Sequence, residues 1–379
     1  MGVHQPIRIG VLTSSRADFG IYLPLLKALR DDRAFTLELI VFGTHLSPYH
    51  GLTRNEIIKE GFEIDHEIAS LLITDDASSI SSSFGLTALK FSEFWKQNGK
   101  SFDVVFCLGD RFEMAAAVLA AVPFNIRFAH LHGGETTLGA IDNTYRHAIS
   151  LASSIHFVSA QPFADRVQEL CGLQSKIIVT GSLSLDNLDE IKELSQQEVQ
   201  LKWNIDLSKR FVLVTIHPET VAFDKNKQYA LEAVNALKRI ASEENLVFTM
   251  PNADTNGTIF REAFQSLAHR FPERVFIVEN FGVQGYFTCM RAASLLVGNT
   301  SSGIIEAASF GKYVVNIGDR QKGRLASDNV VHVPFESNAI VKAWKELSGR
   351  TYDGKNIYKL GRASTRIIET LKEYFDETV

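Results

Sequence analysis

Apolar and polar residues alternate along the first half of the chain in two recurring patterns. Short continuous apolar runs predict buried strands at 7–13, 37–42, 104–108, 127–131, 155–158 and 176–179. Between them, apolar residues recur at helical spacing over 22–30, 111–121, 143–152 and 163–170. Uninterrupted apolar strands that are each followed by an amphipathic helix indicate a parallel sheet with helices on both faces. The pattern therefore predicts a doubly wound α/β unit.

The pattern weakens over a polar stretch at 184–207 and then begins again. Strands are predicted at 211–216, 246–250, 275–278, 295–298, 313–317 and 330–333, with helices at 230–242, 260–271 and 304–310. The last segment, 356–379, is amphipathic and is expected to be a helix that folds back. We therefore expect two Rossmann-like domains, 1–185 with the C-terminal helix at about 357–379, and 186–356. Such a pair places a ligand cleft between the carboxyl ends of the two sheets.

Composition narrows the class of protein. The 379 residues carry 39 Lys and Arg against 44 Asp and Glu, a formal charge of −5, so neither nucleic acid nor a membrane surface is an expected partner. The longest nearly apolar run, 114–124, is far shorter than the roughly 20 residues of a membrane span. The N-terminus shows no signal peptide, and the three cysteines are far apart, which fits a reducing compartment. We expect a cytoplasmic globular protein.

Two loops in the first half have the composition of an anion site. The loop 13–20 follows the first strand, and its small hydroxyl residues and Arg16 could bind phosphate at a helix N-terminus. In an ordinary loop, Asp18 would only cap the helix. The segment 109–113 also joins a strand to a helix. Asp110 and Glu113 have the spacing of a capping box, whereas Arg111 lies where a phosphate ligand or an acid/base group would lie.

The segment 130–147 is the richest in titratable groups. His132 and Glu135 flank two glycines, which permit close approach of the backbone to a ligand. Asp142 and Arg146 are four residues apart and could form a simple helical ion pair. This density of acids and bases favours an active site. A metal site at His130, His132 and Glu135 is the weaker interpretation, because the chain has no HExxH motif.

The second half contains two further candidates at predicted strand ends. His217 follows the strand at 211–216 and precedes a proline, although a lone histidine there is more often structural. In the segment 298–307, Ser301 and Ser302 fit a helix N-cap whose free N–H groups would bind a diphosphate. Glu306, about one turn further, could bind ribose hydroxyls. The chain has neither a Walker A motif nor GxGxxG, so a phosphate site must be of this kind.

Together, these motifs resemble the UDP-N-acetylglucosamine 2-epimerase family, in particular its hydrolysing branch that supplies sialic-acid-type sugars. The motifs occur in order as SRADFG (15–20), GDRFE (109–113), HGGE (132–135) with ID and RH up to 147, IHP (216–218) and NTSSGIIE (299–306). The resemblance implies a GT-B-like fold and a reaction that eliminates UDP to a glycal and hydrates it to N-acetylmannosamine. It implies no metal and no cofactor, a UDP-sugar as ligand, and a homodimer.

The resemblance also implies roles for individual residues. Asp110, His132, Glu135, Asp142 and His217 correspond to catalytic positions, with His217 near the diphosphate. The positions that it implies for substrate binding are Arg16, Asp18, His45, Arg111, Arg146, Asn252, Ser301, Ser302, Glu306 and Arg320.

One position departs from the branch that makes N-acetylmannosamine. That branch usually has Glu where this chain has His132, and the His form also resembles relatives that act on 2,4-diacetamido-2,4,6-trideoxy sugar nucleotides of the legionaminic-acid type. His132 could itself transfer a proton near neutral pH. The same reaction on the diacetamido substrate is therefore an alternative. A non-hydrolysing 2-epimerase, a GT-B glycosyltransferase and a non-catalytic sugar-nucleotide-binding protein are the others.

Overall fold

The computed structural model describes residues 5–74, 76–138, 141–172, 175–219, 223–250, 257–279 and 281–376. The chain divides into two compact units. The first unit comprises 1–135, 142–189 and 358–379, and the second comprises 136–141 and 190–357. Each unit contains one parallel sheet.

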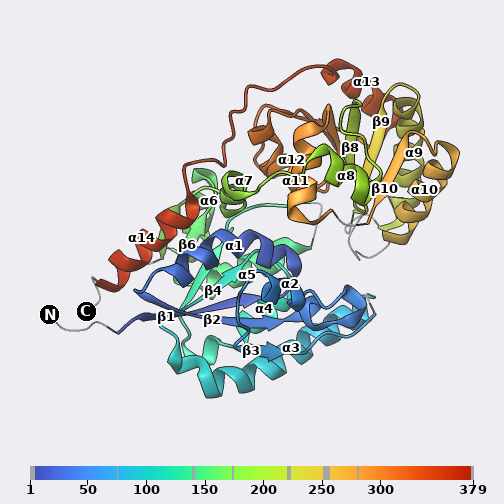
Figure 1. Ribbon diagram of the computed structural model, residues 1–379. Helices are drawn as coiled ribbons and strands as arrows, with labels where there is room; N and C mark the ends of the chain where they lie inside the picture. Colours follow the sequence, from blue (N-terminus) through green and yellow to red (C-terminus); the bar gives the residue numbers. More distant parts are fainter. Residues whose placement is uncertain are drawn as a thin grey trace. The chain divides into compact units, whose positions relative to one another are not determined.

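The sheet of the first unit has seven strands in the order β3-β2-β1-β4-β5-β6-β7 (Figure 1). All neighbouring strands are parallel. The strands are β1 (Ile7–Thr13), β2 (Phe35–Phe42), β3 (His66–Ile68), β4 (Val104–Leu108), β5 (Phe128–Leu131), β6 (Ile155–Val158) and β7 (Lys176–Val179). The helices are α1 (Arg16–Asp31), α2 (Arg54–Lys59), α3 (Ala77–Asn98), α4 (Phe112–Leu119), α5 (Asp142–Leu151), α6 (Gln161–Cys171), α7 (Asp186–Glu190) and α14 (Ala363–Asp376).

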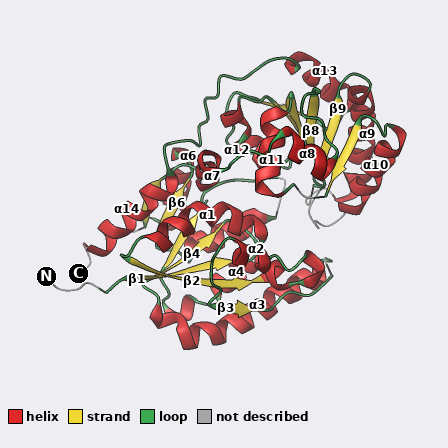
Figure 2. Ribbon diagram, viewed as in Figure 1, coloured by secondary structure: helices red, strands yellow, loops and turns green. Residues whose placement is uncertain are grey.

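The hydrophobic core of the first unit lies on both faces of its sheet, as the apolar runs predict. On β1, Ile9 and Val11 pack with α1 and α14, whereas Leu12 belongs to a separate cluster with α3 and α4. Successive side chains of a strand point to opposite faces, so a continuous apolar run buries both. Figure 2 shows helices on each side of the strands. The doubly wound α/β prediction is confirmed.

The second unit repeats the architecture with six parallel strands in the order β10-β9-β8-β11-β12-β13. They are β8 (Phe211–Thr215), β9 (Asn245–Thr249), β10 (Val275–Val278), β11 (Leu295–Gly298), β12 (Val314–Ile317) and β13 (Val330–Val333). The helices are α8 (Gln196–Trp203), α9 (Asn226–Ala241), α10 (Gly257–Arg270), α11 (Gly282–Ala292), α12 (Ser301–Ile305) and α13 (Ser337–Leu347). The predicted helix at 304–310 is instead the end of α12 followed by a 3₁₀ turn, Ala307–Phe310.

Four elements of the first unit have no counterpart among the predicted ranges, namely the strand β3 and the helices α2, α3 and α7. The short edge strand β3 carries only three residues, too few for a recognisable period. Helix α3 begins with a serine-rich segment, and its N-terminus is capped by Asp76, whose carboxylate accepts hydrogen bonds from Ser79 N at 3.0 Å and Ser79 Oγ at 2.7 Å. Its buried face holds Phe91 and Trp95, which pack against the sheet. Tertiary packing therefore decides this helix more than residue propensity does.

The C-terminal segment forms α14, which packs against α1 within the first unit (Figure 1). Its N-terminus is held by Asp186, a residue 1% exposed and far away in the sequence. The carboxylate of Asp186 accepts hydrogen bonds from Ala363 N at 2.9 Å, Ser364 N at 2.7 Å and Ser364 Oγ at 2.6 Å. A distant side chain thus satisfies the free N–H groups that begin every helix.

Candidate active site

The topology of each sheet brings the candidate motifs to one edge of it. In the first unit the strand order reverses at the pair β1 and β4, and in the second at β8 and β11. Loops at the carboxyl ends of such a strand pair splay apart and leave room for a ligand. The segments 14–18 and 109–111 flank the first reversal point, and 216–219 and 299–302 flank the second.

The loop after β1 is held together by its own side chains. Ser15 is the N-cap of α1, and its hydroxyl accepts a hydrogen bond from Asp18 N at 3.3 Å. Asp18 is buried, and its carboxylate accepts from Ser14 N at 2.9 Å and Ser14 Oγ at 2.6 Å. Asp18 therefore stabilises the loop in place of capping the helix directly. Arg16 is half-buried at the first position of α1, where a helix N-terminus attracts an anion.

His45 lies in the 3₁₀ turn after β2 and is fully buried. Its Nε2 lies 2.9 Å from Thr13 Oγ1, and its Nδ1 lies 2.9 Å from Thr53 Oγ1. Burial lowers the pKa of His45 to about 4, so the ring is neutral near pH 7. With both nitrogens hydrogen-bonded, the described contacts of His45 connect the end of β1 to the start of α2.

The loop after β4 does not form the capping box that its spacing predicts. The N-cap of α4 is Arg111, and no side chain bonds to the cap. Glu113 is fully buried and pairs with Arg111, with Nη2 at 3.0 Å and Nε at 3.3 Å from its two oxygens. Asp110 is therefore free of the capping role, and its side chain is 26% exposed.

Arg146 of α5 is a buried cation at the carboxyl edge of the sheet of the first unit, and 1% of its surface is exposed. Its Nη2 forms an ion pair with Asp110, and its Nη1 donates to the backbone oxygen of Glu135 at 2.7 Å and to Asn143 Oδ1 at 3.0 Å. The guanidinium thus joins the loops after β4 and β5. Asp142, the first residue of α5, is partly buried.

His132 and Glu135 form a hydrogen-bonded pair at the carboxyl end of β5. His132 Nδ1 lies 2.8 Å from Glu135 Oε1, and both residues are buried, with 8% and 2% of their surfaces exposed. His132 Nε2 is buried and has no hydrogen-bond partner among the described residues. A carboxylate that holds one nitrogen of an imidazole leaves the other nitrogen available for proton transfer, as in hydrolase triads.

The two glycines between this pair serve the protein's own packing. Gly134 has φ +76°, and a Cβ on it would lie 2.3 Å from the carbonyl oxygen of Phe163 in α6. A side chain there is sterically excluded, so the observed close approach is to α6. His130, two residues before His132, bonds Gly109 O through Nε2 at 2.9 Å and Ser150 Oγ through Nδ1 at 3.0 Å. Both nitrogens of His130 are therefore already used in the fold.

In the second unit, His217 is positioned through its backbone by Asn299. The amide of Asn299 accepts from His217 N at 2.7 Å and donates to His217 O at 2.9 Å. The backbone oxygen of Asn299 in turn accepts from Gln321 Nε2 at 2.9 Å and from Arg320 Nη1 at 3.3 Å. Asn299 is fully buried and joins the loops after β8, β11 and β12.

Ser301 and Ser302 lie in the first turn of α12 and are partly exposed, but neither is its cap. The N-cap is Thr300, whose hydroxyl accepts from Ser302 N at 3.4 Å. The predicted N-cap is therefore displaced toward the C-terminus, because Ser301 and Ser302 are the first two residues of the helix and Thr300 precedes them as its cap. Glu306 is buried at the C-cap of the same helix.

Sequence reasoning missed several residues that hold these loops. Asn299 and Gln321 were overlooked because neither titrates. Glu219 is buried, and its Oε1 accepts from Asp319 N at 2.6 Å, while Ser159 donates to Glu135. The signal that could have found Asn299 is its place directly after an apolar strand.

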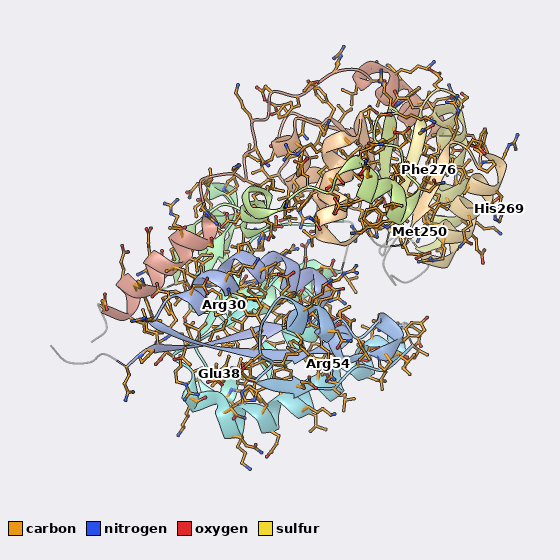
Figure 3. The ribbon with its side chains drawn as sticks, in the orientation of Figure 1. Arg30, Glu38, Arg54, Met250, His269 and Phe276 are labelled. Atoms are coloured by element: carbon orange, nitrogen blue, oxygen red, sulfur yellow. The ribbon has the colours of Figure 1, made fainter. Side chains whose placement is uncertain are left out.

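Some expectations fall outside these contacts. Asn252 lies outside the described residues, which resume after Met250 at residue 257; Met250 lies at the end of β9 (Figure 3). Within the described part of the chain, no three or more His, Cys, Asp or Glu side chains are grouped so that they could hold a metal ion. No helix among the described residues is long and apolar enough to cross a membrane.

The two sheets and the groups at their carboxyl edges are those of an α/β enzyme, and comparison with known proteins identifies its family. The model of the family described as UDP-N-acetylglucosamine 2-epimerase matches residues 27–372. The chain therefore belongs to the UDP-N-acetylglucosamine 2-epimerase family and is a sugar-nucleotide 2-epimerase.

Relatives and solved structures agree with this assignment. The chain is 34% identical over 347 residues to the GDP/UDP-N,N'-diacetylbacillosamine 2-epimerase (hydrolyzing) of Campylobacter jejuni, covering 91% of this chain and 88% of the relative. It is 34% identical over 366 residues to the UDP-N,N'-diacetylbacillosamine 2-epimerase (hydrolyzing) of Legionella pneumophila, covering 96% and 95%. The crystal structure of the Neisseria meningitidis UDP-GlcNAc 2-epimerase bound to UDP-GlcNAc matches with a TM-score of 0.80 at 18% identity, covering 97% and 100%. This likeness confirms the GT-B-like fold.

Proposed function

We propose that the chain is a hydrolysing 2-epimerase of a UDP-linked 2-acetamido sugar. In this reaction a base removes the C2 proton, the bond between C1 and the UDP oxygen breaks, and the electron pair leaves with UDP. Water then adds to the glycal, with its hydroxyl going to C1 and a proton to the opposite face of C2. The free sugar that results is epimeric at C2. The observation that supports the proposal is the buried His132–Glu135 pair in a chain of this family.

In the first unit, the proposal assigns proton transfer to His132 and Asp110. Nε2 of His132 is proposed to take up the proton, and the carboxylate of Glu135 to stabilise the imidazolium that forms. Asp110 is partly exposed and ion-paired with Arg146, which suits a carboxylate that must remain accessible while fixed in orientation. Asp142 is a further proton-transfer candidate. Arg111 is proposed as a ligand of the diphosphate, and Arg146 is proposed to contact or position the sugar. His45 is proposed to act on the sugar side indirectly, by holding the loop after β1 through Thr13.

The second unit is proposed to bind UDP. Ser301 and Ser302 offer hydroxyl and backbone donors for the diphosphate, and Arg320 supplies a positive charge. His217 is proposed to stabilise the negative charge that develops on the departing UDP, and Glu306 to bind the ribose hydroxyls. Arg16 and Asp18 are proposed as further ligands of the nucleotide sugar from the first unit.

The favoured sugar is the 2,4-diacetamido-2,4,6-trideoxy sugar of UDP-N,N'-diacetylbacillosamine. Both relatives that are 34% identical are named for this substrate, and His132 replaces the glutamate that is usual in the branch making N-acetylmannosamine. UDP-N-acetylglucosamine, the first expectation from the motifs, becomes the second candidate because the fold relative from N. meningitidis is bound to it.

NMR in deuterated water tests the proposal with both sugar nucleotides. We expect free UDP and a free sugar that carries deuterium at C2, with kcat/KM at least about tenfold higher for the diacetylated substrate, because a site that recognises a polar group discriminates against a substrate without it. Deuterated sugar nucleotide without UDP release would instead indicate a non-hydrolysing epimerase. Transfer that requires an added acceptor would indicate a glycosyltransferase, and UDP binding without exchange a binding protein.

Two variants separate the proposed roles within the same experiment. Asp110→Asn should abolish C2 exchange while UDP affinity, measured by calorimetry, stays close to that of the native protein. Ser302→Ala should weaken UDP binding and raise KM. Undiminished turnover in Asp110→Asn, or unchanged UDP affinity in Ser302→Ala, would remove that residue from the proposal.

A further inference from the structure

Ser159 connects two loops of the first unit through the carboxylate of Glu135. It lies between β6 and α6 and is 1% exposed. Its Oγ donates a hydrogen bond to Glu135 Oε1 at 3.0 Å, and the same oxygen lies 2.8 Å from His132 Nδ1. One carboxylate oxygen thus receives a hydroxyl from the loop after β6 and an imidazole from the loop after β5.

These contacts define the tautomer of His132. A carboxylate oxygen only accepts, so Nδ1 must carry the hydrogen and donate it. In the neutral ring Nε2 then bears the lone pair. That nitrogen is buried without a partner among the described residues, and the whole residue is 8% exposed. His132 also has φ +63°, a backbone conformation that is uncommon for residues other than glycine and that tends to occur at functional sites.

We propose that Ser159 is a positioning residue for proton transfer at His132, because its hydroxyl holds Glu135 in the orientation that keeps Nε2 unprotonated and directed away from Glu135. This inference rests on the proposed function of His132. Without the hydroxyl, Glu135 Oε1 loses one of its described donors, and the carboxylate can rotate. The ring of His132 would then be less well fixed, and its proton affinity would fall because a displaced carboxylate stabilises the imidazolium less.

The other charged and titratable groups around the pair are accounted for by the fold. Arg146 on α5 donates to the backbone of Glu135 and is ion-paired with Asp110 after β4. His130 on β5 and His156 on β6 are buried, and burial lowers their pKa values to about 3 and about 4. Both rings are neutral near pH 7. Of the groups proposed for the reaction, Asp110, Asp142, His217 and the His132–Glu135 pair, the described side-chain contact of Ser159 is with the pair, so a change in the acid limb that a Ser159 variant causes reports on that pair.

The test compares Ser159→Ala, Ser159→Thr and Ser153→Ala in the full chain. We expect Ser159→Ala to lower kcat about tenfold with little change in KM, since misplacement of a catalytic group costs about that much or more. The acid limb of kcat/KM should move to lower pH by about 0.5 units, the effect of one hydrogen bond. Ser159→Thr keeps the hydroxyl and should restore both values. Ser153 is another buried serine of the first unit, which donates to Ile149 O, and its alanine variant should leave the profile unchanged.

A second measurement does not depend on turnover. Nitrogen NMR of ring-labelled histidine should show His132 as the Nδ1–H tautomer in the native protein and as a mixture of tautomers in Ser159→Ala. Native kcat and an unchanged acid limb in Ser159→Ala would overturn the inference. A loss of activity in Ser159→Ala that leaves the acid limb unchanged and is not restored in Ser159→Thr would also overturn it. A native protein that shows the Nδ1–H tautomer but releases no UDP from either sugar nucleotide would instead contradict the proposed function.

Discussion

At the scale of single residues, the fold uses uncharged side chains to hold the charged ones in place. Asn299 binds both the N–H and the C=O of His217, and Asn226 binds Glu219 in the same way, with N–H to Oδ1 and Nδ2 to O both at 3.0 Å. Each asparagine acts as a clamp on a backbone that has no strand partner at that point. Such buried backbone groups are costly when they lose their partners.

The two clamps offer a matched pair of variants. Both Asn299→Ala and Asn226→Ala should lower the free energy of unfolding by about 2 kcal/mol, because each leaves two backbone groups without their side-chain partner. Only Asn299→Ala is expected to weaken UDP affinity and kcat, by about tenfold, since the backbone that its side chain holds carries His217. Calorimetry with UDP and steady-state kinetics check this. Equal loss of UDP affinity in both variants would refute a specific role of Asn299.

Much of the residue-level chemistry was readable from the sequence, but its pairing was not. The motifs predict candidate residues in the segments that the structure places after β1, β4, β5, β8 and β11. Spacing then suggested a capping box for Asp110, whereas Asp110 pairs with Arg146, which lies on another element. Local spacing describes neighbours along one helix, while these partners come from different loops at one sheet edge. Ser159 could not be found because a serine after a strand is too common to be a signal.

At the scale of elements, a buried carboxylate fixes where α14 begins. Asp186 accepts hydrogen bonds from the first N–H groups of α14, and the apolar face of the helix packs against α1 through Ile367 and Leu371. Packing contributes most of the stability of such a helix, and the cap fixes where it begins.

Replacing Asp186 by alanine should lower the free energy of unfolding by about 2 kcal/mol. This loss is at the upper end of the range for removal of a helix cap, because this cap is buried. Protease cleavage near residue 360 should become faster, since the helix end loses its attachment. Asp76→Ala is the matched control, because Asp76 caps α3 from a solvent-exposed position and its loss should cost about 0.5–1 kcal/mol. Thermal unfolding and limited proteolysis measure both. Similar cleavage rates for the two variants would argue against the proposed attachment.

At the scale of the whole molecule, buried neutral histidines couple stability to pH. Burial lowers the pKa of His45 to about 4, of His130 to about 3 and of His156 to about 4, against about 6.5 in an unfolded chain. Between these values the unfolded chain binds protons that the folded chain does not, so stability is full above about pH 6.5 and falls as the pH decreases toward 4. At pH 5, each such histidine lowers the free energy of unfolding by about 2 kcal/mol.

His156 allows this coupling to be tested, because neither ring nitrogen has a hydrogen-bond partner among the described residues. We expect His156→Leu to lose less stability than the native protein between pH 7 and pH 5, a difference of about 4–8 °C in Tm for a unit of this size. His269→Gln is the control, because His269 is exposed on α10 (Figure 3). A pH dependence of Tm in His156→Leu equal to that of the native protein would contradict the expected coupling.

The sequence by itself determined the α/β class, most strand positions, the family and the loops proposed to carry the chemistry. Those properties follow from local apolar runs and from short motifs, which are legible along the chain. Only the tertiary structure decided the strand order, the three-residue strand β3, the helix α3 and the attachment of α14 by Asp186. It also decided which side chains pair: Asp110 with Arg146, and His132 with Glu135 and Ser159. Most of these contacts join residues that are distant in sequence, and distance in space is set by how the sheet orders its strands.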